Sequence, residues 1–293
     1  MKLLPRRLVT LSLEGSRIRL LGTRGSEVEF WADIPFDERL LRHGQIGDPN
    51  AIGALIGETF HRRGLPRSRV VAAASGLGAV SRIITVAAPH TRLAEAVEIE
   101  ARKVLPETLV DVTLYWQAID PRTSHAPRVF LLATPRDTVM TLIDTLRIAG
   151  IQPLAIDLKP LALYRAVGGK DAVVAHLESQ TLDIVIVVDD LPMLLRTVYL
   201  GEGAGSRDFL LGRLTDELSR TVRYYNDATR AAPLPTAAPI FLSGEDVIDP
   251  HLVATIEALT GHPVVAPQPP LDYPPDFPVE RYLVNIGLAL KSL

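Results

Sequence analysis

The chain has 293 residues, of which 47% are apolar and 22% charged, and its formal net charge is −3. Since one domain typically takes ~150 residues, this length predicts about two domain-sized cores. The apolar fraction excludes disorder as the dominant state. The sequence contains no cysteine, which excludes disulfide scaffolds, thiolate metal sites and cysteine nucleophiles. The balanced charge argues against a protein that coats nucleic acid, which would need a basic excess.

The N-terminus does not have the pattern of a signal peptide. Pro5, Arg6 and Arg7 interrupt the first apolar stretch before it reaches signal-peptide length. No window offers the ~18 uninterrupted apolar residues of a membrane-spanning helix. We therefore expect a soluble protein whose role at a membrane would be peripheral.

Strand and helix signals alternate along the first half of the chain. Asp48-Pro49 has the pattern of a helix N-cap followed by proline in the first turn, and Gly64 marks the end of that helix. In chain order we expect strands at Leu8–Leu13, Ser16–Leu21 and Val28–Ile34, a helix from Pro49 to about Arg63, strands at Val70–Ala74 and Val80–Val86, a helix at Thr91–Val104, a strand at Asp111–Ile119, a polar hairpin loop at Pro121–Pro127, a strand at Val129–Thr134, a helix at Asp137–Ala149, a strand at Ile151–Leu158 and a helix at Pro160–Val167.

The second half has a layout similar to that of the first. Gly168-Gly169 is the best candidate for a domain boundary. After it we expect strands at Ala172–Leu177, Leu182–Val188 and Leu194–Tyr199, a glycine-rich connector at Gly201–Gly205, a helix at Phe209–Ala228, a proline- and alanine-rich linker at Ala231–Pro239, a strand at Ile240–Leu242, a helix at Pro250–Thr260, a short strand at Val264-Val265, an extended segment at Pro267–Pro278 and a helix at Val279–Leu290. The whole pattern predicts an α/β protein of two similar lobes.

Motifs that carry chemistry are weak or missing. No Gly-Lys-Ser/Thr occurs, so the chain lacks a Walker A loop. The seven histidines show no metal-binding spacing. Ser75 lacks the first glycine of a nucleophile elbow, and Glu98 and Glu100 lie two residues apart on a predicted helix, so they do not face each other. We predict no catalytic and no metal-binding residue.

Taken in order, several segments resemble the actin-like PilM family of type IV pilus assembly, which is related to FtsA. The resemblance covers nearly the whole chain and depends on the collinear order of its parts. The matching segments are Gly44–Pro49 with the helix after it, Val70–Ala74 with Ser81–Val86, Glu95–Ala101 with Leu105-Pro106, Leu131–Pro135, Ala149–Pro153 with Ala155–Asp157, Leu218–Tyr225 and Ile286–Leu290.

The resemblance implies an actin-like fold of two lobes with a nucleotide between them. The first lobe would span residues 1–168, with an inserted small subdomain at about 78–146. The second would span 169–293, with a helical subdomain, at about 200–232, that is reduced relative to the family. Family members bind the cytoplasmic N-terminal tail of an inner-membrane partner. The expected location is thus cytoplasmic, peripheral at the inner face of the membrane, with self-association as a further expectation and no nucleic-acid partner.

The sequence departs from this family at the nucleotide loops. Where the first phosphate loop has Asp-Ile-Gly-Ser, this chain has Ser12, Leu13, Glu14 and Gly15. The second phosphate loop aligns with His176, Leu177 and Glu178, and the adenosine loop aligns with Gly244-Glu245-Asp246. The degenerate cleft positions are Ser12, Glu14, Gly15, Ser16, Arg19, His176, Glu178, Ser179, Gly244 and Glu245.

Glutamate in place of glycine opposes nucleotide binding in two ways. Glycine allows close approach of the backbone to phosphate, and glutamate adds bulk. Glutamate also adds a negative charge, and two like charges ~4 Å apart repel by about 4 kcal/mol at an effective dielectric of 20. We therefore predict no cofactor. The alternative is bound ATP and magnesium, with Ser16 and Arg19 contacting phosphate if the strand register is slipped.

The sequence favours a non-enzymatic, actin-like scaffold that binds peptide through the 78–146 region and the adjoining first lobe. In this reading the Thr91–Val104 helix forms one wall of the groove. Three alternatives remain open: an active ATPase of the same fold, the cytoplasmic L-type module of type II secretion, and a sugar or acetate kinase. The end of the chain at Leu293, directly after the last helix, disfavours the type II secretion module. The lost phosphate-loop residues disfavour the sugar or acetate kinase.

Overall fold

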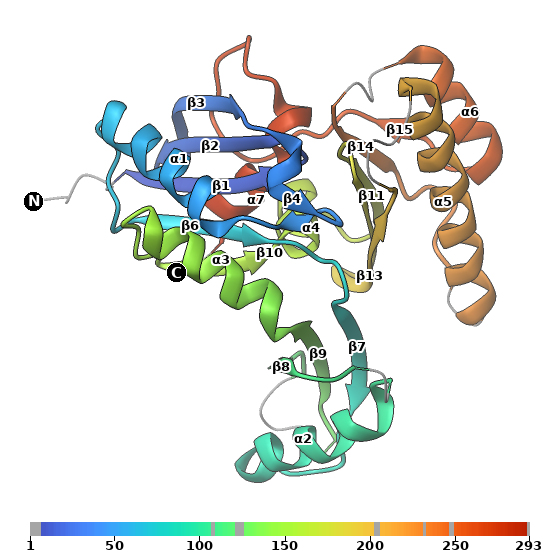
Figure 1. Cartoon of the computed structure of the whole chain (residues 1–293). Helices are drawn as coiled ribbons and strands as arrows, with labels where there is room; N and C mark the ends of the chain where they lie inside the picture. The colour runs from blue at the N-terminus through green and yellow to red at the C-terminus, as the bar shows by residue number, and fades with distance from the viewer. Residues whose placement is uncertain are drawn as a thin grey trace, which may run out of the picture.

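Two five-stranded sheets with the same plan dominate the computed structural model, which describes residues 7–106, 109–120, 126–201, 206–230, 233–245 and 249–291 (Figure 1). The predicted loop at 121–127, the connector at 201–205 and the linker at 231–239 lie partly outside these residues. Asp246 and the two ends of the chain lie wholly outside them.

The first sheet has the strand order β10-β6-β1-β2-β3. Its strands are β1 (Leu8–Glu14), β2 (Arg17–Arg24), β3 (Glu27–Pro35), β6 (Val70–Ala74) and β10 (Ala155–Leu158). β1, β2 and β3 form an antiparallel meander, and β6 runs parallel to both β1 and β10. Every residue of β6 is buried, as its unbroken apolar run predicts for a parallel central strand.

The second sheet repeats this plan in the order β13-β12-β11-β14-β15. Its strands are β11 (Ala172–Leu177), β12 (Thr181–Val188), β13 (Leu191–Tyr199), β14 (Ile240–Gly244) and β15 (Val264–Val265). β11 to β13 form the antiparallel meander, and β14 and β15 are the parallel strands. The prediction of an α/β fold with two similar lobes is confirmed.

Helices cover the outer face of each sheet and fill the space between the sheets. α1 (Pro49–Arg62) and α3 (Arg136–Ile148) pack on the first sheet, and α5 (Arg207–Ala228) and α6 (Pro250–Thr260) pack on the second. α4 (Lys159–Val167) and α7 (Leu283–Ala289) share one apolar cluster with residues of both sheets. This inner layer is the main apolar connection between the lobes.

A small three-stranded sheet extends from the first lobe (Figure 1). It has the order β7-β9-β8, with β7 (Val80–Thr85), β8 (Val112–Ala118) and β9 (Arg128–Pro135). A short η2 turn (His90–Arg92) leads into α2 (Leu93–Val104), which buries Leu93, Val97 and Ala101 against its own sheet. β8 is an edge strand with three exposed residues.

The structure differs from the predicted elements in local ways. A 3-10 turn, η1 (Glu38–Leu40), and a two-residue hairpin of β4 (Leu41–Arg42) and β5 (Gln45–Ile46) were not predicted, since segments this short carry no periodicity. The last predicted helix is split into a 3-10 turn, η3 (Val279–Tyr282), and α7. β10 begins at Ala155, after Pro153, because proline cannot donate a ladder hydrogen bond. The division of the chain at Gly168 and the subdomain limits remain predictions.

No helix within the described ranges is both long enough and apolar enough to cross a bilayer.

The packing of α7 on α4 generates a stability prediction. A Cβ at Gly287 would lie 1.8 Å from the carbonyl oxygen of Ala162, so Gly287→Ala must push two buried helices apart. We expect a loss of at least about 2 kcal/mol in the free energy of unfolding. Gly212→Ala is the matched control, because Gly212 lies within α5 with no atom near its Cβ position. This control should gain about 0.5–1 kcal/mol. Urea denaturation of the two variants checks the contrast, and an equal effect would contradict the packing.

Candidate functional site

The turns of two hairpins meet between the lobes. The β1–β2 turn of the first lobe contains Gly15, and the β11–β12 turn of the second contains Glu178. The end of β14, at Gly244 and Glu245, lies beside them. The observed register pairs Ser12 with Arg19 and Glu14 with Arg17, so Gly15 and Ser16 form a two-residue turn.

The Glu178 carboxylate joins the two lobes. Its Oε2 accepts a hydrogen bond from the backbone N–H of Gly15 at 2.8 Å, and its Oε1 accepts one from Lys159 Nζ at 2.5 Å. A Cβ at Gly15 would lie 2.6 Å from the Ser179 hydroxyl, and Gly15 has a positive φ of 54°. Only glycine therefore fits both the turn and the close approach of the second hairpin. An exposed backbone N–H in such a turn is a typical phosphate donor, and here it binds a carboxylate of the protein itself.

Arg19 connects the first hairpin with the end of β14 and with η3. Its guanidinium is buried, pairs with Glu14, donates to Glu245 Oε1 at 2.8 Å and donates to the carbonyl oxygen of Arg281 at 2.8 Å. Burial lowers the pKa of Arg19, but Glu14 and then Glu245 outweigh burial, so this pKa rises. Burial raises the pKa of Glu14, but Arg19 and then His176 outweigh it and hold this pKa well below its usual range.

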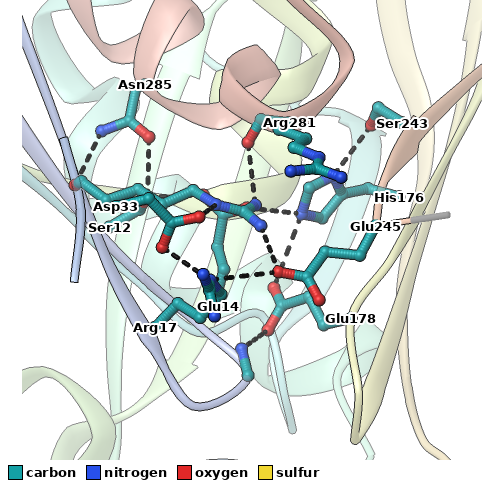
Figure 2. A network of polar contacts seen from close by, with 12 residues as sticks. Ser12, Glu14, Arg17, Asp33, His176, Glu178, Ser243, Glu245, Arg281 and Asn285 are labelled. Carbon is teal, nitrogen blue, oxygen red and sulfur yellow. Dashed lines mark hydrogen bonds and ion pairs between the residues drawn. The ribbon is translucent and has the colours of Figure 1, made fainter. Parts of the chain in front are cut away.

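His176 and Asn285 complete the network (Figure 2). The fully buried His176 ring has Nε2 3.1 Å from Glu14 Oε2 and Nδ1 2.8 Å from Ser243 Oγ. Asn285, on α7, donates to the carbonyl oxygens of Thr10 and Arg19 at 3.2 and 3.1 Å. The Ser12 hydroxyl lies 2.9 Å from Asn285 Oδ1 and 2.5 Å from Glu14 Oε1.

Little space remains where the hairpin turns meet. The cavity there has about 50 Å³ and is lined by Glu14, Gly15, Ser16, Arg17, Arg19, Leu177, Glu178, Ser179 and Glu245. Pockets for small-molecule ligands usually have ~300–1,000 Å³. Gly244 is packed as tightly, since a Cβ there would lie 1.9 Å from the carbonyl oxygen of Leu177.

The structure brings all ten degenerate cleft positions into this one region. Ser16 lines the small cavity, and Ser179 Oγ lies 3.4 Å from Glu38 on the unpredicted loop between β3 and β4. Arg19 is engaged by protein groups, and a register in which Ser16 and Arg19 contact phosphate stays a prediction. Among the described residues, no group of three or more His, Asp or Glu could hold a metal ion.

Sequence reasoning missed Lys159, Asp183 and Asn285. A signal existed for Asp183, which is a charge within the otherwise apolar β12, whose first seven residues are buried. Its Oδ1 accepts a hydrogen bond from Thr197, and its Oδ2 has no partner. Burial first, and Glu178 second, raise the pKa of Asp183 to about 6.

A second concave region lies beside the small sheet. Two adjoining hollows of about 250 and 350 Å³ share Gln117, Phe130, Asp157, Leu161 and Lys291. We call them the groove. Its other described lining residues are Ala74, Tyr115, Trp116, Leu132, Thr134, Val139, Ile156 and Leu158 in the smaller hollow, and Ala118, Ile119, Tyr164, Arg165, Leu191 and Pro192 in the larger.

None of the described lining residues of this groove comes from α2, which packs on its own sheet and borders a separate hollow with Ala87, Ala88 and Pro89. That this helix forms one wall of a peptide groove stays a prediction.

The raised pKa of Asp183 predicts a pH-dependent effect on stability. A carboxyl whose pKa rises from 3.8 in the unfolded chain to about 6 on folding destabilises the fold as pH rises through that window, by on the order of 2–3 kcal/mol at pH 7.5. Asp183→Asn removes this cost and keeps an oxygen for Thr197. Thermal unfolding should show the variant gaining stability relative to wild type between pH 4 and pH 7.5. The exposed Asp227→Asn should show no such trend, and a pH-independent difference for Asp183→Asn would refute the assignment.

Several solved protein structures are similar to this chain over nearly its whole length. A solved PilM–PilN type IV pilus biogenesis complex contains a chain that is 22% identical, with 97% of each chain covered and a TM-score of 0.78. The cytoplasmic domain of EpsL, from the type II secretion system of Vibrio cholerae, is 11% identical, with 98% and 97% covered and a TM-score of 0.55. A Bacteroides thetaiotaomicron protein with an actin-like ATPase fold is 11% identical, with 97% and 95% covered and a TM-score of 0.52.

These likenesses show that the fold is actin-like, as predicted from the sequence. No curated protein matches the chain. The family described as type IV pilus assembly protein PilM matches residues 17–200, more than half of the chain. The β11–β12 hairpin, β2 and the small sheet lie within the matched range, whereas β1 and Gly15 precede it. The chain therefore belongs to the PilM family of type IV pilus assembly proteins.

Proposed function

We propose that this PilM-family protein is a scaffold that works without nucleotide and binds the cytoplasmic N-terminal tail of an inner-membrane pilus assembly protein. The observation that supports this most is the buried network in the cleft. Glu178, Arg19 and Glu14 occupy the meeting point of the phosphate and adenosine loops. Glu178 is bound by Gly15 and Lys159, and Arg19 pairs with Glu14 and Glu245.

A nucleotide would have to overcome this network. It would have to displace the Glu178 carboxylate from the N–H of Gly15 and from Lys159, and breaking a buried ion pair of this kind costs ~3–5 kcal/mol. Its phosphates would then face Glu14, Glu178 and Glu245, which line the remaining cavity, and each like-charge pair ~4 Å apart costs about 4 kcal/mol at an effective dielectric of 20. The two terms together come to about 7–9 kcal/mol, which is comparable to the whole binding energy of a micromolar ligand, about 8 kcal/mol.

The groove is the best candidate for the site of the tail. β8 leaves one edge unpaired within its sheet, and an extended peptide can add to such an edge. Tyr115 and Trp116 on β8 are 49% and 39% exposed, and aromatic side chains of this kind dominate binding energy at interfaces. A relative with this fold was solved in a complex with PilN. The tail would attach the protein to the inner face of the membrane.

Two other functions are less well supported. A module of type II secretion shares the fold, as the likeness to EpsL shows, but the family match is to PilM. An ATPase would need the cleft that the glutamates occupy.

The nucleotide-free proposal predicts that ATP does not stabilise the protein. With 5 mM Mg·ATP the melting temperature should not rise, and calorimetry should show no binding heat. A ligand present at 100 times its Kd would stabilise the native state by about 2.7 kcal/mol. A clear rise that requires magnesium would support the ATPase alternative.

The lining of the groove predicts that binding of the tail depends on Trp116. Trp116→Ala should weaken binding of a synthetic peptide of the partner tail at least tenfold, measured by calorimetry or anisotropy, because it removes the exposed aromatic side chain beside the β8 edge. Tyr224→Ala is the matched control, since Tyr224 is an exposed aromatic residue on α5 outside the groove. Equal affinity of the two variants would place the tail elsewhere.

A further inference from the structure

The cleft and the groove share one wall, made of three consecutive residues. Asp157 and Leu158, at the end of β10, line the groove. Lys159, the first residue of α4, is buried on the other side and pairs with Glu178 in the cleft. The backbone here is held locally, because Asp157 Oδ1 accepts a hydrogen bond from the N–H of Leu158 at 2.9 Å. A shift of Lys159 must therefore displace the groove wall.

α4 carries the same connection further. Leu161 and Arg165 on this helix line the groove, and Arg165 pairs with Asp157. Lys291, beyond α7, also donates to Asp157, at 3.1 Å. The groove wall and its charged rim are thus attached to α4, and Lys159 at the start of α4 is bound to Glu178 of the second lobe.

The opposite rim of the groove belongs to the second lobe. Leu191 and Pro192, at the start of β13, line the larger hollow. The Tyr164 hydroxyl, on α4, donates to the carbonyl oxygen of Asp190 at 2.7 Å. The width of the groove therefore depends on how the two lobes are held together, and the Glu178 bridges to Gly15 and Lys159 cross between the lobes.

We infer that Lys159 and Glu178 are positioning residues for the partner groove: their buried ion pair holds the lobes and the 157–159 segment in the arrangement that accepts the tail. This inference rests on the proposed function. The cleft network then fixes the shape of the binding surface without nucleotide.

The test compares removal of one charge with removal of both. Glu178→Gln leaves Lys159 buried and unpaired, and this should lower both stability and affinity for the tail peptide. The double variant Lys159→Met/Glu178→Gln removes both charges of the pair, so most of its stability should return. The ion pair between the lobes is still missing, even though the introduced amide oxygen can accept from the N–H of Gly15. Affinity for the peptide should therefore stay at least tenfold below wild type. Affinity that recovers with stability would overturn the inference.

Glu217→Gln is the matched control. The Glu217 carboxylate is as buried as that of Glu178 and pairs with Arg196, Arg213 and Arg220 on the second lobe. None of these four residues lines the groove or the cleft cavity. This variant should lose stability and keep wild-type affinity for the peptide. A similar loss of affinity would mean that any buried charge defect has the same effect, and would refute a positioning role.

A readout without peptide separates this inference from the proposed function. In a Trp31→Phe background, Trp116 is the remaining tryptophan, and it reports on the groove directly. The double cleft variant should raise acrylamide quenching of Trp116 at least twofold, and Glu217→Gln should not. If wild type binds no peptide but quenching changes in this way, the proposed function fails and the link from cleft to groove stands. If quenching does not change, the link is refuted.

Discussion

The structure depends on one carboxylate shared by two lobes. Glu178, from the second lobe, binds the backbone N–H of Gly15 and the ammonium of Lys159, both from the first. We propose that these groups stand where a nucleotide phosphate would otherwise bind between the two hairpins. Here a side chain provides the negative charge. The contact is intramolecular, so no ligand has to be present for the lobes to meet.

Burying so much charge is tolerated because nearly every group has a partner. Glu14 faces Arg19 and His176, and Arg19 also reaches Glu245 across the cleft. A buried ion pair adds little to net stability, but losing one partner is costly. Such a network specifies one arrangement of the lobes more than it strengthens the fold. Within the described part of the chain, the buried atoms without a hydrogen-bond partner include Asp183 Oδ2 and Arg19 Nε, and these are the residual cost of the arrangement.

The sequence predicted the fold and the composition of the cleft well, but not how the cleft residues are connected. The paired hairpins follow from strand periodicity, and the glutamates at positions 14, 178 and 245 stand out against the family pattern. The partners could not be predicted, because Lys159 and Asn285 reach the cleft through packing of α4 and α7 between the sheets. The sheet that α2 covers could not be predicted either, because an amphipathic helix has the same pattern whichever sheet it covers.

We propose that the lobes are held together without nucleotide. A distance measured between one site on each lobe tests this most directly. The chain has no cysteine, so Arg62→Cys on α1 and Asp227→Cys on α5, both exposed, give one spin-label pair across the lobes. Pulsed electron resonance should find a single narrow distance distribution that 5 mM Mg·ATP leaves unchanged and that Glu178→Gln broadens. A broad distribution in the wild-type background that narrows with Mg·ATP would contradict the account.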